Sequence, residues 1–140
     1  MGHEALALFG ALALLLSGCR AIRFEEEPAP APARAIVQIA GSWNGTLEVE
    51  GQQIPGTLVL RQRDDRLEAS FAAAELGGET AGSGEIDAEG SLRIELRYRT
   101  QCPGTVAMTG AILDDAARLA GSLTATDCTG RAAGAFSFTR

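Results

Sequence analysis

Apolar and polar residues alternate with a period of two from about Ile36 to the C-terminus. Successive side chains of a β-strand point to opposite faces, so this pattern predicts strands with one buried and one solvated face. Residues 43–50 and 67–73 follow it. The clearest run sets four apolar or aromatic residues against charged ones: Leu92, Ile94, Leu96 and Tyr98 against Arg93, Glu95, Arg97 and Arg99.

Seven turn signals rich in Gly, Asp and Pro separate the alternating runs. They divide the region into eight strands of about nine to eleven residues with short connections, which favours an up-and-down antiparallel meander. A single sheet with one apolar face buries it by closing into a barrel, which also removes the sheet edges. The predicted fold class is therefore all-β, an eight-stranded barrel over residues 36–140, with a β-sandwich as the alternative. The signals are Gly51, Asp64-Asp65, Gly77-Gly78, Ala88-Glu89-Gly90, Pro103-Gly104, Asp114-Asp115 and Thr129-Gly130.

The alternation also predicts which side chains point into the barrel. Their number is about enough to fill a narrow eight-stranded barrel, which favours a packed interior over a pocket. Five glycines of the same parity leave room for a cavity: Gly45, Gly82, Gly84, Gly110 and Gly121. The predicted inward residues are Trp43, Leu47, Val49, Leu58, Leu60, Leu67, Phe71, Ile86, Leu92, Ile94, Leu96, Tyr98, Val106, Met108, Ile112, Leu119, Leu123, Phe136 and Phe138.

The first predicted strand begins with Gly41-Ser42-Trp43. This triplet resembles the Gly-x-Trp that opens lipocalin- and avidin-like (calycin) barrels. In that superfamily a basic residue near the last strand packs on the tryptophan, and Arg140 is the first candidate here, with Arg131 second. The resemblance implies that Trp43 is buried at the closed end of the barrel and serves packing. It also implies that any pocket would hold an apolar small molecule.

The N-terminus carries an export signal. Residues 5–16 form an uncharged apolar run, too short to span a bilayer comfortably but typical of a signal peptide. The following Leu16-Ser17-Gly18-Cys19 resembles the lipobox of bacterial lipoproteins. That resemblance implies a helical signal peptide over residues 1–18, cleavage after Gly18, and acyl chains on Cys19 that anchor the protein in a membrane. The alternative is a plain secretory leader with a free cysteine.

The implied location is the bacterial cell envelope. Arg20, rather than an aspartate, follows the cysteine, which favours the outer membrane, facing the periplasm or the cell surface. Residues 19–35 form a linker in which Pro and Ala alternate, and this composition favours an extended polyproline spacer. A proline-rich ligand for a partner is the alternative reading of the linker.

Two cysteines, Cys102 and Cys128, remain after Cys19. An even pair in an exported chain suggests a disulfide. The meander places the turns near residues 51, 77, 102 and 129 at one end of the barrel, so both cysteines lie there, on either side of the sixth strand. A redox-active pair is the alternative, but the spacing lacks the C-x-x-C pattern.

Composition narrows the function. The net charge of −6 argues against nucleic acid as the main partner. The single histidine, His3, lies in the leader, so the exported chain has no imidazole for acid–base catalysis or for an ordinary zinc or haem site. No nucleophile motif or phosphate loop is present. We therefore expect no enzyme activity, no cofactor and no metal site.

Acidic residues gather in the turns at the opposite end of the barrel from the cysteines. Bunched carboxylates can bind Ca²⁺, but Asp is also a common turn residue, and we favour the structural role. These residues are Asp64, Asp65, Asp87, Glu89, Asp114 and Asp115.

Two functions compete for a non-enzymatic, lipid-anchored barrel of this kind. The first is binding of a lipophilic small molecule. The second is a protein-interaction module of the envelope, such as a hydrolase inhibitor. A cavity of at least a few hundred Å³ favours the first, and a filled barrel with large projecting loops favours the second.

Overall fold

The computed structural model describes residues 28–31, 34–100 and 102–140. The predicted signal helix and the lipidation site at Cys19 lie outside these residues. The described residues 28–31 are exposed and have no regular secondary structure. Among the residues described, no helix is long and apolar enough to cross a membrane.

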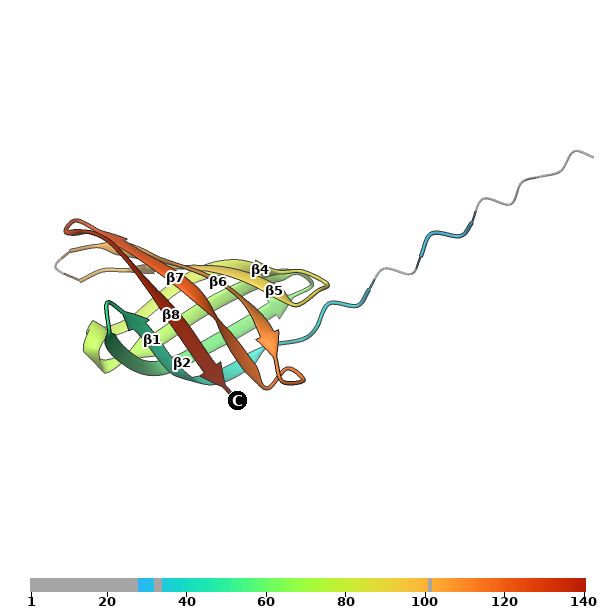
Figure 1. Ribbon diagram of the computed structural model, residues 1–140, viewed down its shortest axis with the longest axis horizontal. Helices are drawn as coiled ribbons and strands as arrows, with labels where there is room; N and C mark the ends of the chain where they lie inside the picture. The colour runs from blue at the N-terminus through green and yellow to red at the C-terminus, as the bar shows by residue number, and fades with distance from the viewer. Residues whose placement is uncertain (1–27, 32–33, 101) are drawn as a thin grey trace, which may run out of the picture. The chain divides into compact units, whose positions relative to one another are not determined.

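Eight antiparallel strands form a closed barrel in chain order (Figure 1). A short 3₁₀ helix, η1, follows the third strand. The elements are β1 (Gly41–Val49), β2 (Gln52–Arg63), β3 (Arg66–Ala73), η1 (Ala74–Leu76), β4 (Gly78–Ile86), β5 (Ser91–Tyr98), β6 (Gly104–Leu113), β7 (Arg118–Asp127) and β8 (Gly130–Thr139).

Strand β1 closes the barrel because it pairs with both β2 and β8. Leu47 lies opposite Ile54 on β2 and opposite Phe136 on β8. Every strand therefore has two neighbours, and the sheet has no free edge. The predicted all-β meander barrel is confirmed, and the β-sandwich is excluded.

The connections fall at the predicted turn signals. Between β1 and β2, both Glu50 (φ 51°) and Gly51 (φ 79°) have positive φ, as the central residues of a type I′ hairpin turn do. In the β4–β5 turn, Oδ1 of Asp87 accepts hydrogen bonds from the backbone N–H groups of Glu89 (3.0 Å) and Ser91 (2.9 Å). Asp87 thus satisfies backbone donors of its own turn, which is the structural role expected for it.

The interior matches the predicted alternation closely. All but three of the predicted inward residues are buried, and the exceptions, Val49, Tyr98 and Ile112, are half-buried against the core. The list of inward residues omitted five buried residues: Ile39, Ala69, Ala73, Thr80 and Gly90.

The inward glycines do not open a cavity, so the alternative that they leave room for one is wrong. At each of the five, an added Cβ would overlap a backbone carbonyl oxygen of the adjacent strand. At Gly45 it would also lie 2.8 Å from Cδ1 of Phe138. Glycine here allows neighbouring backbone and aromatic rings to approach closely, so these positions are filled rather than empty.

Large side chains concentrate between the middle of the barrel and the end where the chain terminates. The rings of Phe71 and Phe138 meet edge to face with centroids 5.7 Å apart, and Phe136 lies 6.2 Å from Phe138. Trp43 completes this group and is fully buried. Toward the other end the inward positions include Ala125 and Ala132, so side-chain size falls along the barrel axis.

Candidate functional site

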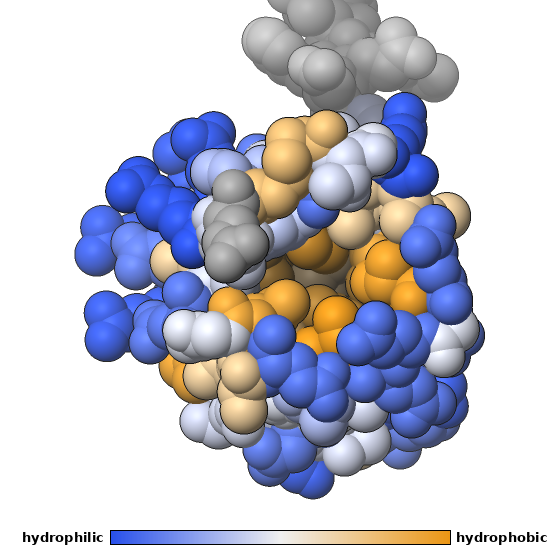
Figure 2. Space-filling view, turned by 90° about the vertical axis from the view of Figure 1, so that its left-hand side faces the viewer, coloured by the Kyte–Doolittle hydropathy of each residue, from blue (hydrophilic) through white to orange (hydrophobic). Residues whose placement is uncertain are grey.

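A cavity of about 560 Å³ opens at the barrel end that carries the β1–β2 turn, the β7–β8 turn and η1. Figure 2 faces this end and shows apolar side chains inside a hollow with a largely hydrophilic rim. We call it the mouth cavity. Its lining residues are Leu47, Val49, Glu50, Gln52, Ile54, Leu76, Tyr98, Thr100, Val106, Ala125, Asp127, Thr129, Gly130, Arg131 and Ala132.

The mouth cavity exists because small residues occupy adjacent inward positions. Ala125 on β7 lies opposite Val106 on β6 and Ala132 on β8. Across the opening, Leu47 and Ile54 form a paired position of β1 and β2. The short side chains of β7 and β8 leave unfilled space above an apolar floor, which is the usual form of a small-molecule site.

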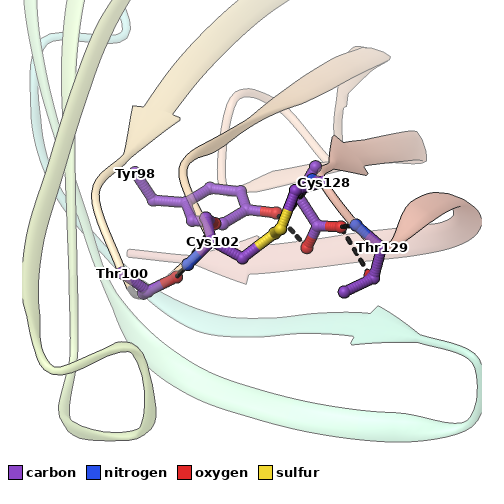
Figure 3. Close-up of a disulfide and its surroundings, with 6 residues drawn as sticks. Tyr98, Thr100, Cys102, Cys128 and Thr129 are labelled. Carbon is purple, nitrogen blue, oxygen red and sulfur yellow. Dashed lines mark hydrogen bonds between the residues drawn. A yellow bond between two sulfur atoms is a disulfide. The ribbon is translucent and has the colours of Figure 1, made fainter.

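A polar pair, Tyr98 and Asp127, lines the mouth cavity, and Figure 3 shows Tyr98 and its hydrogen bond. The hydroxyl of Tyr98 donates a hydrogen bond to Oδ2 of Asp127 at 3.1 Å. The backbone N–H and the hydroxyl of Thr129 donate to Oδ1 of Asp127 at 2.8 and 2.6 Å. The carboxylate therefore has donors on both oxygens.

These contacts determine the charge state of the pair. Hydrogen bonds from the side chain and backbone of Thr129 hold the pKa of Asp127 below its ordinary value. Burial raises the pKa of Tyr98, and the hydrogen bond to Asp127 and its negative charge raise it further. At neutral pH the pair is thus a neutral phenol donating to an ionised carboxylate.

Gly104 on β6 makes room for the pair, because Tyr98 on β5 must reach across β6 to Asp127 on β7. A Cβ at Gly104 would lie 2.5 Å from the Tyr98 hydroxyl oxygen and 2.7 Å from Cβ of Asp127. A side chain at this position would collide with both members of the pair and with the carbonyl oxygen of Thr126, 2.5 Å from the added Cβ.

The Cys102–Cys128 disulfide borders the same end of the barrel (Figure 3). The predicted pairing is confirmed, with the two Cα atoms 5.6 Å apart. Both cysteines lie outside the strands: β5 ends at Tyr98 and β7 ends at Asp127, so Cys102 is in the β5–β6 connection and Cys128 is in the β7–β8 turn. The disulfide ties this connection to the β7–β8 turn beside Asp127.

Comparison with known proteins supports the fold. No protein-family model and no curated protein matches the chain. Among solved structures, it is similar to a redesigned β-barrel, mFAP1, which was solved bound to DFHBI. The two share 20% sequence identity with a TM-score of 0.50, over 77% of this chain and 100% of that chain. This likeness supports the barrel fold alone.

The opposite end of the barrel is closed, and Trp43 lies there. Its Nε1 donates a hydrogen bond to the carbonyl oxygen of Ile39 at 2.9 Å. The guanidinium carbon of Arg140 lies 4.5 Å from the centre of the Trp43 ring, and its Nη2 donates to the carbonyl oxygen of Gln38 at 3.2 Å. Trp43 and Arg140 are thus in contact, and neither lines the mouth cavity. We call this end of the barrel, which contains Trp43, Arg140, Ile39 and Gln62, the closed end.

Arg131, the second candidate for contact with Trp43, lies at the wrong end. It belongs to the start of β8 and lines the mouth cavity, whereas Trp43 lies near the start of β1, which runs antiparallel to β8. The second candidate is therefore excluded, and Arg140 makes the contact with Trp43.

Sequence reasoning missed Gln62, which anchors the segment before β1. Its Oε1 accepts a hydrogen bond from the N–H of Ile39 at 2.7 Å. Its Nε2 donates to the carbonyl oxygens of Val37 (3.0 Å) and Asp64 (2.9 Å). A signal was present, because Gln62 follows the buried Leu58 and Leu60 at an inward position, where a polar residue needs a partner.

The pairing of Tyr98 with Asp127 was also missed. Tyr98 was expected to point inward and Thr129 belonged to a predicted turn, but Asp127 was given no role. Within the described ranges, no group of three or more His, Cys, Asp or Glu side chains could hold a metal ion.

Proposed function

We propose that this protein is a non-enzymatic, lipid-anchored lipoprotein of the bacterial envelope that binds a lipophilic small molecule in the mouth cavity. The observation that carries the proposal is the cavity itself, about 560 Å³, with apolar side chains at its floor and polar or charged side chains around its rim. Its volume is within the range of about 300–1,000 Å³ that small-molecule sites have, and its apolar floor can hold a lipophilic ligand.

Two further observations support a binder over a hydrolase inhibitor. The β1–β2 turn has only Glu50 and Gly51 between its strands, and the disulfide holds the β5–β6 connection against the β7–β8 turn. Neither supplies a long loop for insertion into an enzyme's active site. The similar barrel mFAP1 was solved with DFHBI bound, which supports the capacity of such a small barrel to hold a ligand.

Binding can be tested with Nile red, an uncharged apolar dye that fluoresces strongly when it leaves water. We expect saturable binding to the wild-type barrel. Ala125→Phe fills the mouth cavity and should weaken binding by at least about tenfold, since a phenyl ring would occupy the space beside Val106 and Ala132. Ala107→Phe is the matched control, because Ala107 is exposed on the outer face of β6. Equal affinity in both variants would contradict the proposal.

The anchor has a separate test. The apolar leader and Leu16-Ser17-Gly18-Cys19 support acylation of Cys19. Cys19→Ser should leave the protein unprocessed or release it from membranes, and metabolic labelling with a fatty acid should mark only the wild type. Equal labelling of both proteins would contradict the anchor and leave the binding proposal unaffected.

A further inference from the structure

We propose that the Tyr98–Asp127 pair determines ligand specificity: the mouth cavity takes a lipophilic molecule with a hydrogen-bond donor, a hydroxyl or a protonated amine, and rejects a lipophilic carboxylate. This inference rests on the proposed function. It names the chemical class of the ligand, which the apolar floor alone leaves open.

The hydrogen-bonding capacity of the pair carries the inference. The single hydroxyl proton of Tyr98 is directed at Asp127, so its oxygen can only accept a further hydrogen bond. An ionised carboxylate also accepts only. Both members of the pair therefore require a donor on the ligand. A ligand carboxylate has no proton to offer, and it would place a second negative charge beside Asp127.

Neighbouring residues of the barrel hold Tyr98 and Asp127 in place. Gly104 leaves the room that Tyr98 needs to cross β6, and both Tyr98 and Asp127 are half-buried. Thr129 orients the carboxylate from its other side with two hydrogen bonds. A polar group held this way at the edge of an apolar floor is suited to orient a ligand.

The charges around the cavity favour the same class of ligand. The charged lining residues are Glu50, Asp127 and Arg131, two acids against one base. Glu50 and Arg131 are exposed at the rim, where water screens them, whereas Asp127 is half-buried next to the floor. Asp127 should therefore dominate the interaction with a ligand head group.

Three molecules with the same decyl chain test the inference: decan-1-ol, decylamine and decanoate, each displacing Nile red near neutral pH. The wild type should bind the alcohol and the amine about tenfold or more tightly than the carboxylate, a ratio typical of one hydrogen bond to a charged group. Nile red has no donor, so its own affinity reports the apolar floor separately.

Asp127→Asn should reduce the preference to about twofold, because the amide is uncharged and can donate to a carboxylate. Glu95→Gln is the matched control: it removes one negative charge from the outer face of β5, where Glu95 is exposed, and should keep the wild-type preference. Gly104→Ala retains both members of the pair but separates them, and it should also reduce the preference. Unfolding midpoints and Nile red affinity verify that each variant is folded.

Two results would overturn the inference while the proposed function stands. One is equal displacement of bound Nile red by all three decyl compounds from the wild type. The other is tighter binding of decanoate that is lost in Arg131→Gln, which would make the mouth cavity an anion site. If neither Nile red nor any decyl compound binds, the proposed function and the inference both fall.

Discussion

At the closed end, the single tryptophan of the chain is fully buried beneath the Arg140 guanidinium, and its indole N–H is bonded to backbone. At the mouth, the single tyrosine is half-buried beside a cavity, and its hydroxyl is bonded to a carboxylate. Both aromatic residues occupy inward positions on strands with alternating apolar and polar residues. Their surroundings make one a packing residue and the other a candidate ligand contact.

The comparison shows that inward orientation alone does not decide whether a barrel is filled. The closed end is filled because aromatic rings occupy its layers and the segment before β1 packs on it through Ile39. The mouth is hollow because Ala125 and Ala132 are small and no segment of the described chain fills the space above Leu47. The closed end should therefore control stability, and the mouth should control binding.

Truncation of Trp43 is the strongest test of this division. Trp43→Ala should lower the free energy of unfolding by about 3–5 kcal/mol, as expected for a buried aromatic residue, and thermal unfolding measures it. Tyr98→Phe at the mouth keeps the ring and loses one hydrogen bond to an ionised carboxylate, so it should cost less, about 1.5 kcal/mol. Similar losses in both variants, or solvent-like tryptophan fluorescence in the wild type, would contradict the division.

Removal of the disulfide should have the next largest effect. The disulfide lies at the mouth, so here a feature of the mouth contributes to stability. Replacing both Cys102 and Cys128 with Ser should cost about 3.5 kcal/mol, because the bridge closes a loop between residues 26 positions apart. Reduced wild-type protein should show the same unfolding midpoint as the double variant, which serves as its control. Titration of two free thiols in the exported, unreduced protein would show that the bridge is absent.

The Arg140 contact should have a smaller effect, because the side chain is exposed. Arg140→Gln should cost about 0.5–1 kcal/mol, since the cation over the indole is lost, and it should change the tryptophan emission maximum. Arg131→Gln, the same change at the mouth, should leave both quantities unchanged. A spectral shift in Arg131→Gln but not in Arg140→Gln would contradict the contact between Trp43 and Arg140.

The pH dependence of stability should show the smallest effect. The pKa of Asp127 is lowered in the folded state by Thr129. Its contribution is therefore present above the pKa of an unfolded Asp and is lost as the pH falls through the folded value. In urea unfolding across acidic pH, Asp127→Asn should lose stability less steeply than the wild type. Parallel curves would show that the carboxylate contributes nothing to folding.

The sequence by itself determined the strands and the faces of most side chains, and it favoured a meander over the β-sandwich that the structure then excluded. Alternation at residues 92–98 predicted a strand, because a period of two is typical of extended chain. The turn signals at Gly51 and Asp114-Asp115 predicted where strands end. The Cys102–Cys128 pair followed from the meander, which places alternate turns at the same end. The contact of Trp43 with Arg140 was suggested by the calycin resemblance.

Only the tertiary structure decided where the barrel is hollow and which polar groups meet. Alternation assigns a side chain to the inside of a sheet, but not to a height along the barrel axis, which depends on the stagger between strands. It also does not pair residues of strands that are not neighbours. Tyr98 and Asp127 lie 29 positions apart on either side of β6, and they meet because Gly104 has no side chain between them.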